Sequence, residues 1–264
     1  MPVNNKRQLS KGSIAYIALG IVLIAVMTVA GMSAFLRTTD FVVEGTSIYS
    51  VEEVVEASGL SVGANLMFVN TQNAIQNIRS ELPFVSAVEI TRKLPDTVHI
   101  QITESVAVAY IFFAGDYYII DSTGRVLERS RGGDGSITIA NINDLVEIRG
   151  VEIEETDPGS MLKPVFGTET KLQYMEDVLT GLEREELIND VSYLDVSNIV
   201  NVHFGYLNLY RVILGGSTNL RPSNLRHTLS ILPDSVRQVT EAHPNTAGDL
   251  DMSDESGSPK FTLR

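Results

Sequence analysis

The stretch that decides the fold is Leu82-Pro83-Phe84-Val85-Ser86-Ala87-Val88-Glu89-Ile90-Thr91-Arg92-Lys93-Leu94-Pro95-Asp96-Thr97-Val98-His99-Ile100-Gln101-Ile102-Thr103. Residues 84–91 and 97–103 alternate apolar and polar side chains with the period of two that is typical of β-strands. Residues 93–96 between them are rich in turn-forming types. The stretch therefore predicts a β-hairpin that buries one face, with Val98, Ile100 and Ile102 pointing inward.

The sequence before this hairpin predicts one further strand and two helices. Residues 41–45 read as a short strand closed by a glycine. Ser50 followed by Glu53 is the pattern of a capping box, and Gly59 stands where a helix C-cap would. Asn70 predicts the N-cap of a second helix, which Pro83 prevents from continuing. The expected order is strand, helix, helix, strand, strand, with both helices covering one face of the sheet.

An uncharged apolar run of 23 residues, 14–36, lies near the start of the chain. About 20 such residues are needed to cross a bilayer as a helix. The flanking residues 1–13 contain basic side chains and no acid, which by the positive-inside rule predicts a cytoplasmic tail. We expect a single transmembrane helix over 14–36 with the rest of the chain exported; the alternative is a cleaved secretory signal, whose apolar core is usually shorter.

Composition limits what the exported part does. The chain has no cysteine, so disulfides and thiolate metal sites are excluded and stability must come from buried apolar surface. The formal net charge is -13, and because four basic residues precede the first acid, residues 40–264 carry about -17. Such an acidic surface argues against binding nucleic acid or anionic lipid over the exported part as a whole.

Three pieces of sequence resemble a POTRA domain, a small module that docks partners. They are residues 41–45 together with 50–54, residues 82–90 and the run Arg92-Lys93-Leu94-Pro95-Asp96-Thr97-Val98-His99-Ile100. Placed after one apolar segment and closed by residues 102–107, this arrangement is similar to the FtsQ/DivIB family of bacterial cell-division proteins. The resemblance implies a POTRA-like domain over residues 38–107.

The resemblance also implies a second, β-rich domain over residues 108–264. Residues 117–127 read as its opening hairpin around a turn from Asp121 to Gly124, and a helix is expected from Thr170. Short strands follow, and an amphipathic helix begins after Pro222. The expected fold class is α+β: a single N-terminal transmembrane helix, a POTRA-like βααββ domain, and a larger β-rich mixed α+β domain that ends in an edge strand.

The chain offers little sign of chemistry. The four histidines show no metal-ligand spacing, and none has an obvious Asp or Ser partner in sequence. The acidic run 152–157 supplies oxygens that a cation site would need, but such runs are usually solvated loops. Asp249, Asp251 and Asp254 lack the glycine and the distant glutamate of a calcium loop. We expect no enzyme, no catalytic residue, no cofactor and no metal.

The end of the chain is the expected partner-binding site. A terminal strand is usually an edge, and its unpaired backbone groups can accept a strand from another protein. The family resemblance implies that these last strands bind single-pass partners similar to FtsB/DivIC and FtsL. The residues expected to contact a partner are Leu250, Asp251, Met252, Phe261 and Leu263.

The resemblance further implies a division scaffold at the septum that helps to recruit and regulate the septal peptidoglycan synthase complex. It would sit in the cell membrane with its N-terminus in the cytoplasm and its C-terminal domains outside. Two other classes remain open from the residues alone. One is a membrane-anchored extracellular hydrolase whose catalytic residues converge only in the fold, and the other is a POTRA-containing factor of outer-membrane assembly or secretion.

Overall fold

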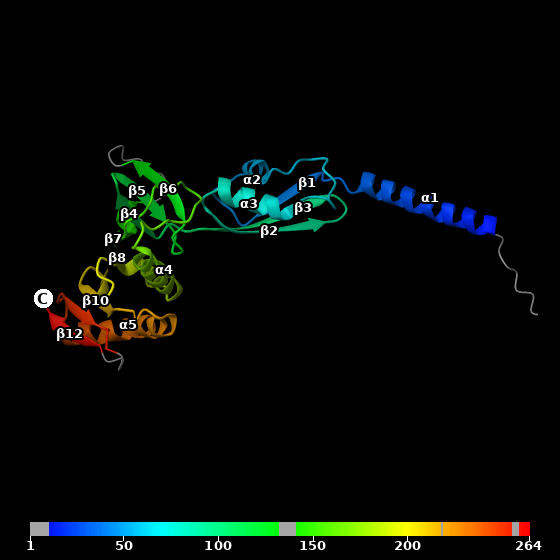
Figure 1. The fold of residues 1–264 in the computed structure, drawn as a ribbon. Coiled ribbons are helices and arrows are strands. Elements are labelled where there is room, and N and C mark those ends of the chain that lie inside the picture. Colours follow the sequence, from blue (N-terminus) through cyan, green and yellow to red (C-terminus); the bar gives the residue numbers. More distant parts are fainter. Residues whose placement is uncertain (1–10, 132–140, 218, 255–258) are drawn as a thin grey trace, which may run out of the picture. The chain divides into compact units, whose positions relative to one another are not determined.

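The computed structural model describes residues 11–131, 141–217, 219–254 and 259–264 (Figure 1). The chain divides into two compact units. Unit 1 comprises residues 1–78 and 87–103, and unit 2 comprises residues 79–86 and 104–264. The fold is mixed α+β, as the sequence predicts. The exact bounds 38–107 and 108–264 stay a prediction.

Unit 1 is built around a sheet of three strands in the order β1-β3-β2. Its elements follow the predicted βααββ sequence, and Figure 1 shows both short helices beside the sheet. β1 pairs with β3 in parallel. The bounds are β1 Asp40–Glu44, α2 Val51–Ser58, α3 Thr71–Glu81, β2 Val85–Lys93 and β3 Thr97–Glu104.

The ends of the two helices are set by local side-chain chemistry. Ser50 and Glu53 form the predicted capping box, in which the Glu53 carboxylate accepts the Ser50 backbone N–H at 2.8 Å. This bond holds the pKa of Glu53 below its ordinary value. Gly59 ends α2 in the left-handed conformation, and Asn70 accepts the Asn73 backbone N–H at 3.1 Å before α3. These predicted helix boundaries are confirmed.

The predicted hairpin also forms with its predicted inward face. Val98, Ile100 and Ile102 of β3 are at most 2% exposed, while the side chains between them are at least partly exposed. Val54 from α2 and Ile78 from α3 are fully buried in the same core. Alternation along β3 therefore decides which face of the sheet the helices cover.

α1 spans Lys11–Phe35, and side chains are described for residues 15–28 and 31 of it. Within the described part of the chain, no helix has both the length and the hydropathy that a membrane crossing requires. The predicted transmembrane helix over 14–36 is therefore not confirmed by the fold.

In unit 2 the described strands form one nine-stranded sheet in the order β12-β11-β10-β9-β8-β7-β4-β5-β6. Its helices are α4 Glu169–Arg184 and α5 Pro222–Ala242, with short 3-10 turns at Ile142–Asp144 and Ile188–Asp190. The strands are β4 Ala109–Phe113, β5 Asp116–Ile120, β6 Val126–Arg131, β7 Val146–Arg149, β8 Val191–Asp195, β9 Val202–Tyr206, β10 Tyr210–Gly215, β11 Gly248–Asp251 and β12 Lys260–Leu263.

The two helices of unit 2 approach each other closely at Gly181 of α4. A Cβ atom at Gly181 would lie 2.8 Å from Leu229 Cδ1 and 3.6 Å from Leu225 Cδ2, both on α5. Leu225 and Leu229 belong to the core under the sheet. Glycine is a poor helix former, but at position 181 the absence of a side chain lets α5 pack closely against α4. The gain from this packing outweighs the cost in helix propensity.

We predict that Gly181→Val lowers the free energy of unfolding of unit 2 by about 1–3 kcal/mol, because the added methyl groups overpack the contact with Leu229. Hydrogen exchange of α4 and α5 peptides in urea would measure it. Gln173→Val, at an exposed position of α4, is the matched control and should change stability by less than about 0.5 kcal/mol. Equal effects of the two variants would contradict the packing argument.

Candidate partner-binding edge

β12 stands at one end of the sheet order in unit 2. It pairs with β11 in antiparallel fashion, and β11 in turn pairs with β10 in parallel. Among the described residues no other strand pairs with β12. β11, which holds Leu250 and Asp251, is therefore an interior strand, and of these two strands β12 has the open side.

The direction of the β12 backbone groups follows from one hydrogen bond at its end. The Arg264 N–H donates to the Ala247 carbonyl at 3.3 Å. In an antiparallel ladder, hydrogen-bonded and non-hydrogen-bonded pairs alternate. Thr262, which opposes Asp249, therefore also faces β11. Phe261 and Leu263 direct their N–H and C=O groups away from β11, toward the open side of the sheet.

The structure distributes the five predicted contact residues between core and surface. Leu250 is 1% exposed and Met252 is 6% exposed, so the protein's own core covers both. Asp251 is half-buried, and its Oδ1 accepts the Ser253 N–H at 2.9 Å. Phe261 is half-buried, and Leu263 is 58% exposed. Leu263 and the edge of Phe261 are the predicted residues that a partner can reach.

The Phe261 ring is held in place by residues from three elements. It lies over Gly248 of β11, where a Cβ atom would come within 2.3 Å of the ring. It meets Tyr210 of β10 edge-on at 6.2 Å between ring centroids and stacks on His243 after α5 at 5.6 Å. The Tyr210 hydroxyl and the Thr240 hydroxyl lie 2.8 Å apart. Phe261 thus fastens the edge strand to α5.

Sequence reasoning missed the part that His243 and Gly248 play beside this ring. Gly248 carried a usable signal, since a glycine within a strand often marks a close approach of another group. His243 carried none, because only the fold brings the end of α5 next to a strand that begins 18 residues later.

A groove of about 280 Å³ runs between the last turns of α5 and the start of β12. Its walls combine apolar surface with hydroxyl, amide and imidazole groups. The lining residues are Ser235, Gln238, Val239, Ala242, His243, Pro259 and Phe261. A side chain on a strand added to β12 would have this groove within reach.

Charged side chains occupy the other face of β11 and β12. Asp249 pairs with Arg211 of β10, and its Oδ1 lies 2.8 Å from Arg264 Nε. Lys260 Nζ lies 3.0 Å from Asp254 Oδ2, and this carboxylate raises the pKa of Lys260. The Arg211–Asp249 pair joins directly opposed residues of β10 and β11, so it favours the observed register of these two strands.

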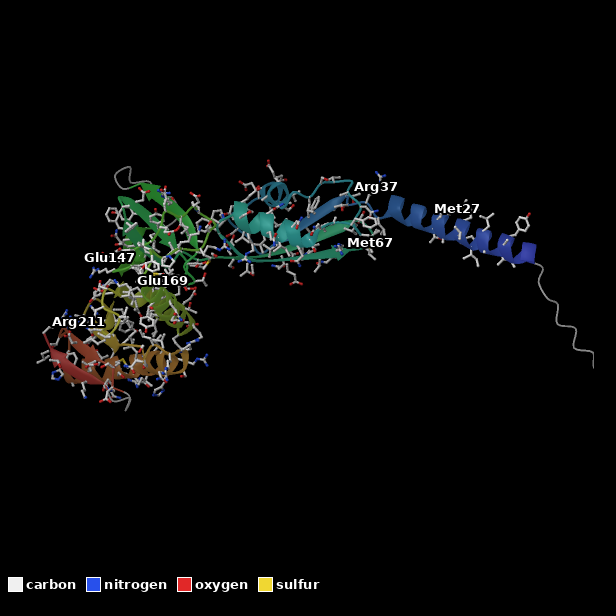
Figure 2. All side chains as sticks on the ribbon, viewed as in Figure 1. Met27, Arg37, Met67, Glu147, Glu169 and Arg211 are labelled. Atoms are coloured by element: carbon white, nitrogen blue, oxygen red, sulfur yellow. The ribbon has the colours of Figure 1, made fainter. Side chains whose placement is uncertain are left out.

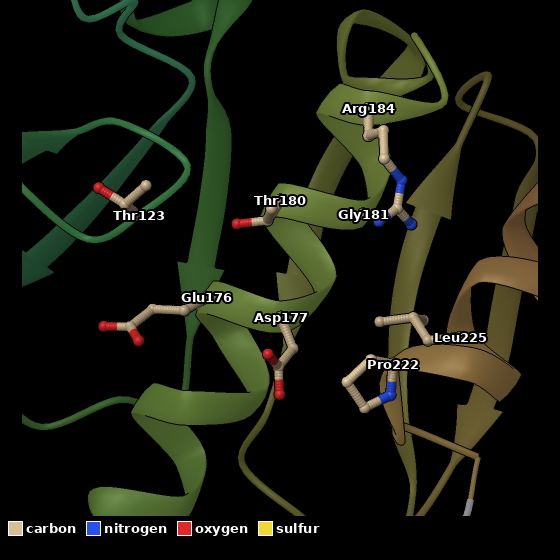
Figure 3. Close-up of a pocket in the computed structure, with 8 residues that line it drawn as sticks. All are labelled: Thr123, Glu176, Asp177, Thr180, Gly181, Arg184, Pro222 and Leu225. Carbon is tan, nitrogen blue, oxygen red and sulfur yellow. The ribbon is translucent and has the colours of Figure 1, made fainter. Parts of the chain in front are cut away.

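A second hollow, of about 300 Å³, lies between α4, the turn after β5 and the start of α5 (Figure 3). Figure 3 shows the Glu176 and Thr180 side chains directed toward the turn that holds Thr123, with Arg184 and Leu225 on the other side of α4. Burial raises the pKa of Glu176 and of Asp177. Both carboxyl groups therefore hold their protons more tightly in the folded chain than in the unfolded chain. Their protonation contributes to the free energy of unfolding at low pH, and this contribution is lost as pH rises through the folded pKa values.

Neither hollow contains a set of groups that specifies a reaction. Within the described ranges, no three His, Cys, Asp or Glu side chains come together as ligands for a metal ion. The acidic run 152–157 and the Asp249, Asp251 and Asp254 carboxylates do not form such a group. What the edge offers is backbone hydrogen-bonding groups beside a partly apolar groove, and this arrangement is suited to binding a polypeptide.

Residues 36–105 match the family model described as "POTRA domain, FtsQ-type". The match covers the βααββ elements of unit 1, with the capped helix α2 and the β2–β3 hairpin. The fold of unit 1 and this match identify residues 36–105 as a POTRA-type domain.

Named relatives cover much more of the chain. The cell division protein DivIB of Clostridium tetani is 25% identical over 198 residues, which are 74% of this chain and 70% of the relative. DivIB of Clostridium botulinum (strain Hall) is 28% identical over 213 residues, or 80% of this chain and 76% of the relative. The cell division protein FtsQ of Corynebacterium glutamicum is 30% identical over 125 residues, 47% of this chain and 56% of the relative. The chain is thus similar to DivIB and FtsQ cell-division proteins, and its residues 36–105 match the FtsQ-type POTRA domain.

We predict that Gly248→Ala loosens β12, because the new Cβ would occupy the position of the Phe261 ring. Hydrogen exchange should show faster exchange of the Thr262 and Arg264 amides, while β10 amides keep their protection. Thr262→Ala, whose exposed side chain points to the other face, should leave the exchange nearly unchanged. Unaltered protection in Gly248→Ala would show that the ring does not fasten the strand.

Proposed function

We propose that this protein is a scaffold of the bacterial division machinery that performs no catalysis itself. It binds single-pass partners similar to FtsB/DivIC and FtsL, and through them it helps to recruit and regulate septal peptidoglycan synthesis. Support comes from the division-protein names of its relatives and from the FtsQ-type POTRA match. The observation that carries the proposal is the open side of β12 beside the α5 groove.

The binding mechanism is addition of a partner strand to β12. The outward N–H and C=O groups of Phe261 and Leu263 form a short ladder with an extended segment of the partner. Affinity comes from these main-chain bonds, and specificity comes from the partner side chains that alternate into the groove. Leu250 and Met252 support the interaction from the core by holding β11 in place, since both are buried.

We also propose that residues 14–36 attach the protein to the cell membrane, with residues 1–13 in the cytoplasm and the two domains, 38–107 and 108–264, outside. The 23 uncharged residues and the basic tail support this topology. Attachment confines scaffold and partners to one surface, so the short ladder at β12 can suffice for assembly. Release of the full-length chain from membranes by an alkaline carbonate wash would contradict the attachment.

A division scaffold should concentrate where the cell divides. We predict that the full chain, tagged at its N-terminus with a fluorescent protein, forms a band at the division plane in constricting cells. Live imaging measures the ratio of midcell signal to signal along the envelope. Uniform signal along the envelope would refute the proposed division function.

The strand-addition mechanism predicts that Leu263→Pro weakens partner binding by about tenfold. Proline at this position removes only an N–H that faces away from β11, so pairing of β12 with β11 is kept, while one main-chain bond to the partner is lost. The measurement is pull-down of the DivIC/FtsB-like protein of the same cell by the full-length chain.

Two matched variants separate the backbone from the side chain. Leu263→Ala removes the exposed side chain but keeps the N–H, so it should weaken binding less than Leu263→Pro. Removal of residues 248–264 should abolish binding and leave the POTRA domain folded. Full binding by Leu263→Pro and by the shortened chain would rule out the edge as the binding site.

A further inference from the structure

The most exposed apolar side chains of unit 1 outside α1 gather at one end of it. Among its described residues from Leu36 onward, the large apolar side chains that are more than half exposed are Val62, Met67, Phe68 and Leu94. Their exposed fractions are 68%, 54%, 84% and 68%. Three come from the loop between α2 and α3, and the fourth comes from the β2–β3 turn. We call these four residues the apolar tip.

Backbone hydrogen bonds join the long loop of the apolar tip to the residues that follow α1. The Leu66 N–H donates to the Leu36 carbonyl at 2.8 Å, and the Thr38 N–H donates to the Ala64 carbonyl at 2.8 Å. Phe68 is two residues beyond Leu66, so at most about 7 Å of chain separates it from this contact. In Figure 2 Met67 and Arg37 lie at the same end of unit 1.

The hairpin turn of the apolar tip is attached to the same segment. The Thr39 N–H donates to the Asp96 carbonyl at 2.9 Å, and the Thr39 hydroxyl donates to Asp96 Oδ2 at 2.8 Å. Leu94 is two residues before Asp96. Both loops of the tip are therefore fixed at the point where the apolar segment 14–36 ends.

Basic side chains stand beside the apolar tip, although the exported part as a whole is acidic. Arg37 and Lys93 are exposed. Arg92 Nη2 donates to the Val69 carbonyl at 2.7 Å, which holds the loop next to the basic end of β2. Exposed aromatic and aliphatic side chains with nearby Lys and Arg are the combination that favours the boundary between lipid headgroups and acyl chains.

We propose that the apolar tip inserts into the surface of the lipid bilayer and so docks the POTRA domain on the membrane. This inference rests on the proposed attachment through residues 14–36. A bilayer fits better than a protein partner because the tip is hydrogen-bonded to the first residues after the proposed anchor, which brings its side chains to the membrane surface. Insertion removes apolar side chains from water and restricts how the domain turns about its anchor.

The chain contains no tryptophan, so a single introduced tryptophan reports on its own position. The test uses the full-length protein in nanodiscs of phosphatidylcholine and phosphatidylglycerol in which the phosphatidylcholine chains carry bromine, a short-range quencher. The probes are Phe68→Trp and Met67→Trp in the tip, with Met27→Trp in the proposed anchor. Phe166→Trp is the matched control, because Phe166 is 97% exposed and lies in unit 2.

The expected result is a blue-shifted and quenched emission from Phe68→Trp and Met67→Trp, with water-like, unquenched emission from Phe166→Trp. If both tip probes remain unquenched while Met27→Trp is quenched, the tip does not enter lipid and the inference is overturned with the anchor intact. If Met27→Trp is unquenched, the proposed attachment fails, and the inference fails with it. Equal quenching of Phe166→Trp would mean non-specific adsorption and would also overturn the inference.

Discussion

Parallel pairing of β10 with β11 is the interaction on which the open edge depends. Two parallel neighbours need a long crossover, and α5 provides it. The crossover packs Leu225, Leu229 and Leu232 under the sheet, so the same residues that bury apolar surface also place β11. The chain then turns back once more, and β12 becomes the outermost strand. Without the α5 crossover, β12 would have no neighbour and Phe261 would have no surface to pack on.

The edge combines two ways of limiting unwanted contacts. On one face of this edge, Asp249 of β11 pairs with Arg211 of β10 and with Arg264, and Lys260 is paired with Asp254. Charges on an edge discourage pairing with copies of the same chain, which in this acidic protein would also repel one another. The opposite face keeps an apolar approach through Phe261 and Leu263. An edge of this kind favours a partner that matches both faces.

Unit 1 follows its local sequence closely. The capping box at Ser50, the left-handed Gly59 and the alternation along β3 each act over a few residues, and each is found where the sequence places it. For this reason the FtsQ-type POTRA match and the βααββ prediction agree with the observed elements. Hydrogen bonds from Leu66 and Thr38 bring the α2–α3 loop to the end of α1, and these contacts connect residues about 26 to 30 positions apart. No local pattern predicts that placement.

The sequence by itself determined the class of fold, the caps of the POTRA helices and the inward face of the hairpin, because those features depend on spacing and on neighbouring residues. It also led to the prediction that a partner binds at the last strands. Tertiary structure alone decided which of Leu250, Met252, Phe261 and Leu263 reach the surface, since exposure depends on the strand order and on the helix that lies below. It likewise placed His243 beside Phe261 and Gly181 against Leu229. Long-range packing brings these pairs together, and a one-dimensional pattern of polar and apolar residues does not record it.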